Sequence, residues 1–160
     1  MAVLRFATHL WFDRDAVAAA ELYTGLLPDS RIERVVATPP GIPDGTEGDP
    51  FIVDVVLAGQ HYTFLNGGPR FPFDAQVSLY AVVETQEEVD RLWSSLLEGG
   101  GREVRCGWLT DRFGLSWQIV PNRLIELMSD PDGLRVARVM GAMMQMKKIV
   151  IADLEAAAAG

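Results

Sequence analysis

The sequence predicts an α+β fold: two βαβββ repeats that form a curled mixed sheet around a cavity, followed by a C-terminal helical extension. The same order of strand and helix patterns occurs twice before Pro121, and the apolar faces of the two helices match at a constant offset of 70 residues, since Tyr23 corresponds to Trp93. After Pro121 the pattern changes to helical segments. We therefore expect one domain over 1–121 and an extension over 122–160.

The first half of this domain, residues 1–70, is expected to hold one helix and four strands. Alternating and β-branched residues predict strands over Val3–Phe12, Ile32–Thr38, Phe51–Leu57 and His61–Asn66. The helix follows the first strand, with Asp13 as its cap and Pro28 as its stop. Its apolar face comprises Ala19, Leu22, Tyr23, Leu26 and Leu27. Prolines and glycines predict a loop over 38–50, and Ala58-Gly59 predicts a tight turn.

The second half, residues 74–121, repeats this order. The predicted strands are Val77–Val83, Arg102–Cys106, Trp108–Thr110 and Leu115–Val120. Thr85 opens the helix, with Glu88 closing a capping box. The apolar face of this helix comprises Val89, Leu92, Trp93, Leu96 and Leu97. Each half alone would have one bare sheet face, and we expect the two faces to curl around a shared ligand cavity.

The extension is expected to be helical. A short turn over Leu124–Met128 precedes a helix that Asp132 caps and that ends at Met146, and a last helix covers Ile149–Ala159. Four methionines form a stripe that we interpret as core or dimer packing, with an adaptable binding surface as the alternative: Met140, Met143, Met144 and Met146.

Composition excludes several classes of partner. A net charge of -8 and a pI near 4.7 argue against nucleic acid and against an anionic membrane surface, because both require clustered Lys and Arg. No run of about 18 apolar residues predicts a transmembrane helix, and the alternating N-terminal residues do not resemble a signal peptide. The single cysteine, Cys106, cannot form an intrachain disulfide and is expected to be a small buried residue. We therefore expect a cytoplasmic protein.

Five segments resemble the PhnB-like family of the vicinal-oxygen-chelate (glyoxalase/bleomycin resistance) superfamily. They are LWFD (Leu10–Asp13) with the Ala-rich helix that follows it and ends ELYTGLLPDS (Glu21–Ser30), LNGGPRF (Leu65–Phe71), ETQEEVDRLW (Glu84–Trp93), CGWLTDRFGLSWQIVP (Cys106–Pro121) and MKKIVIADL (Met146–Leu154). The family is often labelled demethylubiquinone methyltransferase-like. The resemblance implies the vicinal-oxygen-chelate fold and a homodimer, with an activity that is largely unproven.

The glycines of the chain argue against methyl transfer with a nucleotide-type cofactor. Such a site needs a glycine-rich loop after a strand and before a helix. Gly99–Gly101 follow a helix, and Gly67-Gly68 precede Pro69 with no helix beginning there. We expect no cofactor.

Enzymes of this superfamily usually hold a divalent metal through the first and last strand of each half. By resemblance, Gln118 stands where a ligating Glu often stands, and aligning Gly59 with Gly114 places Thr63 opposite it. Counting back from the two helices places Thr8 and Ser78 at the first-strand positions. All four residues are neutral and are weak ligands for divalent ions, so we expect no metal. A register shift of one residue would instead bring His9 and His61 beside Gln118.

A neutral set of this kind suits the binding of a small molecule. Four aromatic residues could form stacking walls around Thr8, Thr63, Ser78 and Gln118: Trp11, Phe71, Trp108 and Trp117. Each of these aromatic residues could instead belong to the core, and Gln118 could instead make a structural hydrogen bond to a neighbouring strand. Asp54 is a candidate general base if it is buried, and otherwise it faces solvent.

Three hypotheses follow from these residues. The first is a metal-free, homodimeric small-molecule-binding protein. The second is a metal-dependent lyase, isomerase or dioxygenase that uses His9 or His61. The third is an assembly or regulatory partner that acts through its helical tail.

Overall fold

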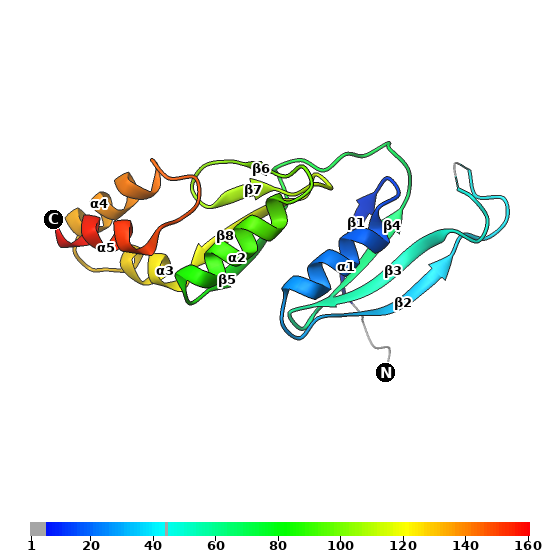
Figure 1. Cartoon of the computed structure of the whole chain (residues 1–160), viewed down its shortest axis with the longest axis horizontal. Coiled ribbons are helices and arrows are strands. Elements are labelled where there is room, and N and C mark those ends of the chain that lie inside the picture. The colour runs from blue at the N-terminus through cyan, green and yellow to red at the C-terminus, as the bar shows by residue number, and fades with distance from the viewer. Residues whose placement is uncertain (1–5, 44) are drawn as a thin grey trace. The chain divides into compact units, whose positions relative to one another are not determined.

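The computed structural model describes residues 6–43 and 45–160, and the chain divides into two compact units, residues 1–73 and 74–160 (Figure 1). The first unit is a four-stranded mixed sheet with one helix. Its elements are β1 (Thr8–Phe12), α1 (Ala16–Leu26), β2 (Arg31–Ala37), β3 (Pro50–Leu57) and β4 (Gln60–Asn66). The strand order is β1-β4-β3-β2, in which only β1 and β4 are parallel. The predicted βαβββ order of this half is confirmed from residue 8 onward, whereas the start of the predicted first strand, residues 3–5, lies outside the described residues.

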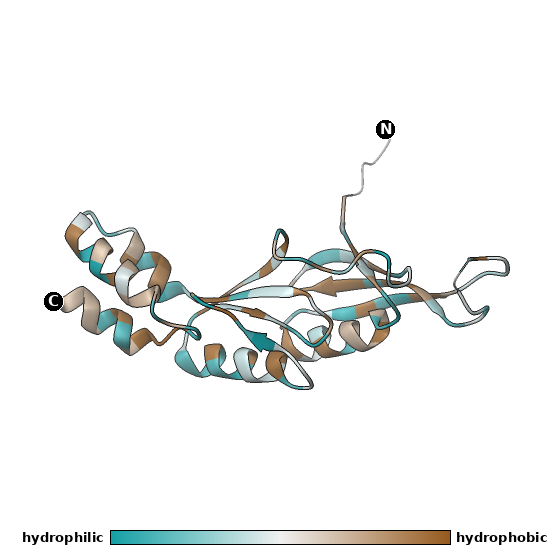
Figure 2. Ribbon diagram, turned by 90° about the horizontal axis from the view of Figure 1, so that it is seen from above, coloured by the Kyte–Doolittle hydropathy of each residue, from teal (hydrophilic) through white to brown (hydrophobic). Residues whose placement is uncertain are grey.

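Helix α1 packs on one face of this sheet through its small and aromatic residues. Tyr23 is fully buried and meets Phe64 of β4 edge-on, with ring centroids 6.0 Å apart. Ala16, Ala19 and Ala20 are also fully buried, whereas the predicted face residues Leu22, Leu26 and Leu27 are only half-buried in this unit. Hydrophobic residues (brown in Figure 2) recur along the strands, which lie above the helices in this view.

The predicted cap of α1 is wrong. Asp15, not Asp13, is the N-cap residue, and its side chain makes no capping hydrogen bond. The free N–H of Ala16 instead donates to Oδ1 of Asn66 at 2.9 Å, so β4 supplies the cap across the sheet. The tight turn is confirmed, because Ala58 and Gly59 both have positive φ, 46° and 79°, as a two-residue hairpin requires.

The second unit repeats this topology, with the strand order β5-β8-β7-β6 and β5 parallel to β8. Its elements are β5 (Ser78–Val83), α2 (Gln86–Leu97), β6 (Arg102–Glu103), β7 (Trp108–Thr110) and β8 (Ser116–Pro121). The α+β class and the paired βαβββ order are therefore confirmed. Strand β6 is shorter than predicted, because Cys106 has a positive φ of 58° and its N–H donates to the carbonyl of Met146.

Helix α2 begins with the predicted capping box. The Thr85 hydroxyl accepts from the Glu88 N–H at 3.2 Å, and the Glu88 carboxylate accepts from the Thr85 N–H at 3.1 Å. Backbone N–H groups of Glu84 and Thr85 hold the pKa of Glu88 below its usual value.

Three helices follow β8 in the second unit: α3 (Asn122–Met128), α4 (Gly133–Met143) and α5 (Ile151–Ala159). They share a core with the end of β8, made of Val120, Leu124, Leu127, Val139, Ile149, Leu154 and Ala158. Asp132 caps α4 as predicted, since its Oδ1 accepts from the Leu134 N–H at 2.9 Å. No helix within the described residues is long and apolar enough to span a membrane.

Helix α4 ends at Met143, earlier than the predicted Met146, since the carbonyls of Met146 and Lys147 turn to accept from the Cys106 and Gly107 N–H groups. Two methionines of the predicted stripe, Met143 and Met146, pack against the helical core. The interpretation of core packing is wrong for Met140 and Met144, which are exposed in this unit; dimer packing by these two stays a prediction.

Candidate functional site

The face of the second sheet away from α2 carries a pocket. Alternation along β8 turns Trp117 and Ile119 toward α2, where both are buried, and turns Gln118 and Val120 to the other side. The pocket has a volume of about 380 Å³. It is lined by Tyr80, Cys106, Trp108, Gln118, Val120, Leu124, Ile125, Met128, Ser129 and Met143. We call it the second-sheet pocket.

Gln118 lies at the centre of a cross-strand row in this pocket. Tyr80 of β5 and Trp108 of β7 are its register partners, so the two rings flank its side chain. Its Nε2 donates to Oγ of Ser78 at 2.9 Å. This bond orients the amide and leaves Oε1 as an acceptor for which no donor is found among the described residues.

The second-sheet pocket contains no charged side chain. None of its lining residues is Asp, Glu, Lys, Arg or His. The Ser129 hydroxyl donates to the carbonyl of Ile125 at 2.8 Å and is thereby occupied. Cys106, expected to be a small buried residue, is half-buried and lines the wall. An aromatic and aliphatic pocket with one oriented amide favours an uncharged ligand, because a buried charge without a partner is costly.

The corresponding row of the first sheet is polar. The ladder pairs His9 with Thr63 and Thr63 with Asp54, and these are the equivalents of Tyr80, Gln118 and Trp108. Thr63 Oγ1 donates to Asp54 Oδ1 at 3.0 Å, and Arg34 Nε donates to Asp54 Oδ2 at 2.8 Å. Asp54 is therefore half-buried in an ion pair, so it is neither a free general base nor simply solvent-facing.

The predicted equivalence of Thr63 and Gln118 agrees with the ladders, but the counting that paired Thr8 with Ser78 is wrong. The connection between β1 and α1 has one residue more than the connection between β5 and α2, so the strands are offset by 71 residues whereas the helices are offset by 70. His9 therefore lies on the open face beside Thr63, and Thr8 lies on the α1 side with Leu10. Ligand binding by Thr63, Ser78 and Gln118 stays a prediction.

The four aromatic residues predicted as pocket walls lie in different places. Trp108 lines the second-sheet pocket, whereas Trp117 is only 2% exposed in the core and donates from Nε1 to Asp111 at 2.9 Å, so it does not face the pocket. In the first unit, Trp11 meets the exposed Phe71 edge-on at 5.0 Å and donates from Nε1 to the carbonyl of Gly68 at 2.8 Å. Trp11 also borders a separate hollow of about 200 Å³.

The residues do not fit a divalent metal. Within the described part of the chain, no three His, Cys, Asp or Glu side chains come together as a metal site would require. His61 Nδ1 instead lies 3.5 Å from Glu33, and Asp54 is engaged by Arg34. In the second-sheet pocket, the lining residue that stands at an expected metal-ligand position is Gln118, and its side chain is a neutral amide.

Comparison with known proteins gives the family. The family model described as 3-demethylubiquinone-9 3-methyltransferase matches residues 4–120. The chain belongs to this PhnB-like family. A solved structure from Bacillus cereus, described as a putative 3-demethylubiquinone-9 3-methyltransferase and PhnB protein, is 28% identical with a TM-score of 0.66, and the match covers 74% of this chain and 99% of that one. Protein PA1353 from Pseudomonas aeruginosa is 20% identical with a TM-score of 0.61, covering 74% and 98%, and shares the fold. No curated protein matches the chain.

The PhnB-like match stops where the last strand ends. Helices α3 to α5 lie beyond residue 120, so the resemblance noted at Met146–Leu154 falls outside the matched residues. Two of the glycines considered for a cofactor loop, Gly67 and Gly101, have packing roles here. A Cβ on Gly67 would overlap the Trp11 ring, and a Cβ on Gly101 would lie 2.7 Å from the carbonyl of Leu96.

Proposed function

We propose that the protein binds an uncharged, largely apolar small molecule in the second-sheet pocket and holds it without a metal ion. The observation that carries this proposal is the charge-free pocket around Gln118, whose amide is oriented by Ser78. Ligand sites are typically concave and apolar, with a few polar groups that set orientation. Tyr80 and Trp108 supply the ring surfaces, and Gln118 supplies the polar group.

A metal-dependent lyase, isomerase or dioxygenase receives no specific support. Such chemistry polarises a substrate oxygen at a metal held by imidazole or carboxylate groups. His9 and Thr63 pair in the first sheet, and Tyr80 and Gln118 pair at the equivalent positions of the second sheet. Methyl transfer receives no specific support either, because Gly67 packs against the Trp11 ring and Gly101 against the carbonyl of Leu96.

We also propose that the protein works in the cytoplasm as a homodimer. The single cysteine is compatible with a reducing compartment. In the second unit, β5 is an edge strand, and its Val82, which is outside the lining of the second-sheet pocket, remains 45% exposed. Exposed apolar residues on an edge strand are commonly covered by a partner. Light scattering after size-exclusion chromatography measures the mass in solution, and a mass of one chain at micromolar concentration would contradict the dimer.

The binding proposal is tested with 2-naphthol, an uncharged aromatic molecule with one hydroxyl, by calorimetric titration. Wild type should bind it, and Gln118→Ala and Trp108→Ala should each weaken binding by about tenfold, which corresponds to about 1.4 kcal/mol. Gln60→Ala removes an exposed amide from the first unit and serves as the matched control. Absence of binding to wild type, or equal affinity in all variants, would exclude this pocket as the site.

A further inference from the structure

We infer that the helices beyond residue 120 complete the second-sheet pocket by forming its second wall, and that the pocket so completed accepts an uncharged aromatic ligand bearing a hydrogen-bond donor. This inference rests on the proposed function, because it concerns the same pocket. Beyond the proposed function, it names the class of ligand and identifies the residues that form the second wall of the pocket. These residues lie after residue 120, where the match to the family model ends.

Half of the pocket lining comes from the extension. The sheet side is formed by Tyr80, Cys106, Trp108, Gln118 and Val120. The opposite wall is formed by Leu124, Ile125, Met128 and Ser129, at α3 and its C-terminal cap, and by Met143 at the end of α4. A chain that ended with the matched residues would present the sheet side alone, as an open surface.

This second wall is held to the sheet by backbone and side-chain bonds. The Cys106 and Gly107 N–H groups donate to the carbonyls of Met146 and Lys147 at 2.9 and 2.7 Å. Gln86, at the start of α2, clamps the next residues with both ends of its amide: Nε2 donates to the Ile149 carbonyl at 3.1 Å, and Oε1 accepts from the Ile151 N–H at 2.8 Å.

Gly107 allows this close approach. Its φ is +81°, and a Cβ there would lie 2.9 Å from the Ile119 carbonyl and 3.2 Å from Cγ1 of Ile149. A larger residue would overlap the backbone of β8 at Ile119 and crowd the side chain of Ile149 in the extension. The position therefore serves the docking of the helices.

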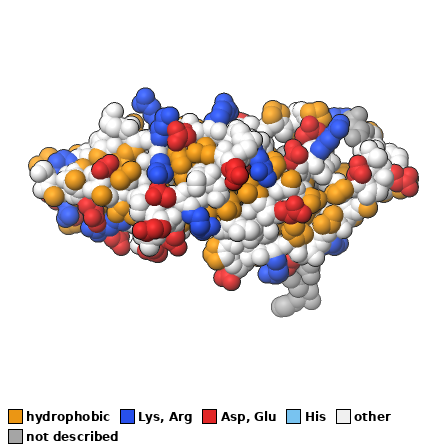
Figure 3. All heavy atoms as spheres, in the orientation of Figure 1, with side chains coloured by type: hydrophobic (Ala, Val, Ile, Leu, Met, Phe, Trp, Pro, Cys, Tyr) orange, Lys and Arg blue, Asp and Glu red, His pale blue; other side chains and the backbone are white. Residues whose placement is uncertain are grey.

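Ion pairs add to this attachment at the surface. Lys147 lies 3.0 Å from Glu103, and Lys148 lies 2.5 Å from Asp90 of α2. The hydrogen bonds from these lysines hold the pKa values of both carboxyls below their usual values. Acidic and basic side chains are interspersed over the face of the molecule seen in Figure 3.

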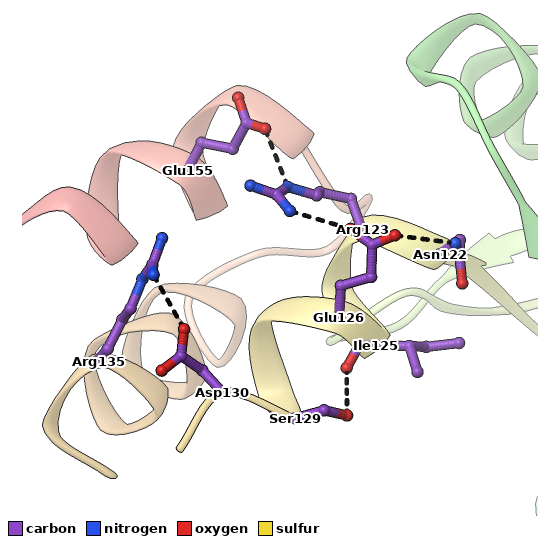
Figure 4. A network of polar contacts seen from close by, with 8 residues as sticks. All are labelled: Asn122, Arg123, Ile125, Glu126, Ser129, Asp130, Arg135 and Glu155. Carbon is purple, nitrogen blue, oxygen red and sulfur yellow. Dashed lines mark hydrogen bonds and ion pairs between the residues drawn. The ribbon is translucent and has the colours of Figure 1, made fainter. Parts of the chain in front are cut away.

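The three helices are also tied to one another. Arg123 of α3 reaches Glu155 of α5 at 3.0 Å and Glu126 at 2.9 Å, and Arg135 of α4 pairs with Asp130 at 2.9 Å (Figure 4). The wall is therefore formed before the ligand arrives, which lowers the entropy cost of binding.

The lining defines the class of ligand. Tyr80 and Trp108 offer ring surfaces on the sheet side, and the thioethers of Met128 and Met143 adapt to an aromatic edge on the other. Because Nε2 of Gln118 is committed to Ser78, its Oε1 can only accept, so the ligand must supply an O–H or N–H. A carboxylate would meet no cation in the lining and would face an acceptor oxygen.

The experiment compares three related probes on the full chain: 2-naphthol, 2-methoxynaphthalene and 2-naphthoate. Wild type should bind 2-naphthol about tenfold more tightly than the methyl ether and should bind the anion least well. Met143→Ala and Ile125→Ala, which trim the extension wall, should each weaken 2-naphthol about tenfold. The control Met140→Ala trims an exposed methionine of α4 outside the pocket and should leave affinity unchanged. Circular dichroism and thermal melting confirm that each variant is folded.

The outcomes separate this inference from the proposed function. If wild type binds none of the probes, the proposed function itself fails. If Trp108→Ala and Gln118→Ala weaken binding but Met143→Ala and Ile125→Ala do not, the pocket is used and the role of the extension is overturned. Equal affinity for 2-naphthol and its methyl ether would overturn the requirement for a donor.

Discussion

The indole of Trp117 donates from Nε1 to Oδ2 of Asp111 at 2.9 Å, and both side chains are buried on the α2 side of the second sheet. The other carboxylate oxygen accepts from the N–H groups of Phe113 and Leu115 at 2.9 and 3.0 Å. Asp111 thus ties the turn before β8 to the strand itself, and it fixes the alternation that turns Gln118 into the pocket.

Replacing Asp111 with Ala should destabilise the protein by about 3 kcal/mol, because buried donors on two backbone groups and one indole lose their acceptor. The free energy of unfolding in urea measures the effect. Asp74→Ala is the matched control, since Asp74 accepts one backbone N–H, that of Gln76, at an exposed site. A loss below about 1 kcal/mol in the Asp111 variant would contradict a structural role for this carboxylate.

Ser78→Ala should change ligand preference more than stability. Without the Ser78 hydroxyl, the Gln118 amide can rotate and present either its oxygen or its nitrogen to the pocket. The preference for 2-naphthol over 2-methoxynaphthalene should fall from about tenfold to about twofold, measured by calorimetric titration. Ser95→Ala, in α2 and outside the pocket, is the control. An unchanged preference would mean that Ser78 does not set the orientation of the amide.

Gln86→Ala should loosen the extension by removing both bonds of the clamp. The expected cost is about 2 kcal/mol, since two backbone groups lose a partner. Amide hydrogen exchange should accelerate at Ile151, whose N–H donates to the Gln86 side chain. Gln145→Ala, an exposed glutamine of the extension, should leave exchange at Ile151 unchanged. Protection at Ile151 equal to wild type in the Gln86 variant would contradict the clamp.

Acid should destabilise the second unit partly through Glu88. The pKa of Glu88 is lowered in the folded state, so its carboxylate contributes stability that is fully present above the usual value of 4.5 and is lost as the pH falls through the lowered folded value. Glu88→Gln cannot lose this contribution, so its melting temperature should fall less than that of wild type on acidification from above pH 4.5 to well below it. Glu87→Gln, also in the first turn of α2, is the control. Parallel pH profiles for wild type and Glu88→Gln would sink this assignment.

The repeats, their helices and the capping box follow from local patterns, and the sequence was sufficient to predict them. The spacing of Tyr23 and Trp93 identifies both helical faces, and both residues are buried against their sheets. Alternation along β8 also contained a signal that the sequence interpretation of Trp117 missed. If Gln118 faces the pocket, its neighbour must face the helix.

Other features depend on tertiary contacts that no local pattern encodes. Asn66 caps α1 from 50 residues away, and the turn of the chain after Met143 is set by backbone bonds to Cys106 and Gly107. The wall that the extension contributes to the pocket also depends on tertiary contacts, because Met128 and Met143 meet the sheet only once the helices have docked. The register of β1 was missed for a simpler reason, which is the extra residue before α1.

That extra residue lies in the connection Asp13–Arg14, whose counterpart in the second half is Glu84 alone. The same insertion within β1 could have inverted the faces of the strand and turned Leu10 and Phe12 away from α1. The two halves keep the same order of strands and helix although this connection differs in length by one residue. The connection between the first strand and the helix can therefore change length without loss of the core. A peptide tag introduced in this connection would leave the alternation of side chains along β1 unchanged.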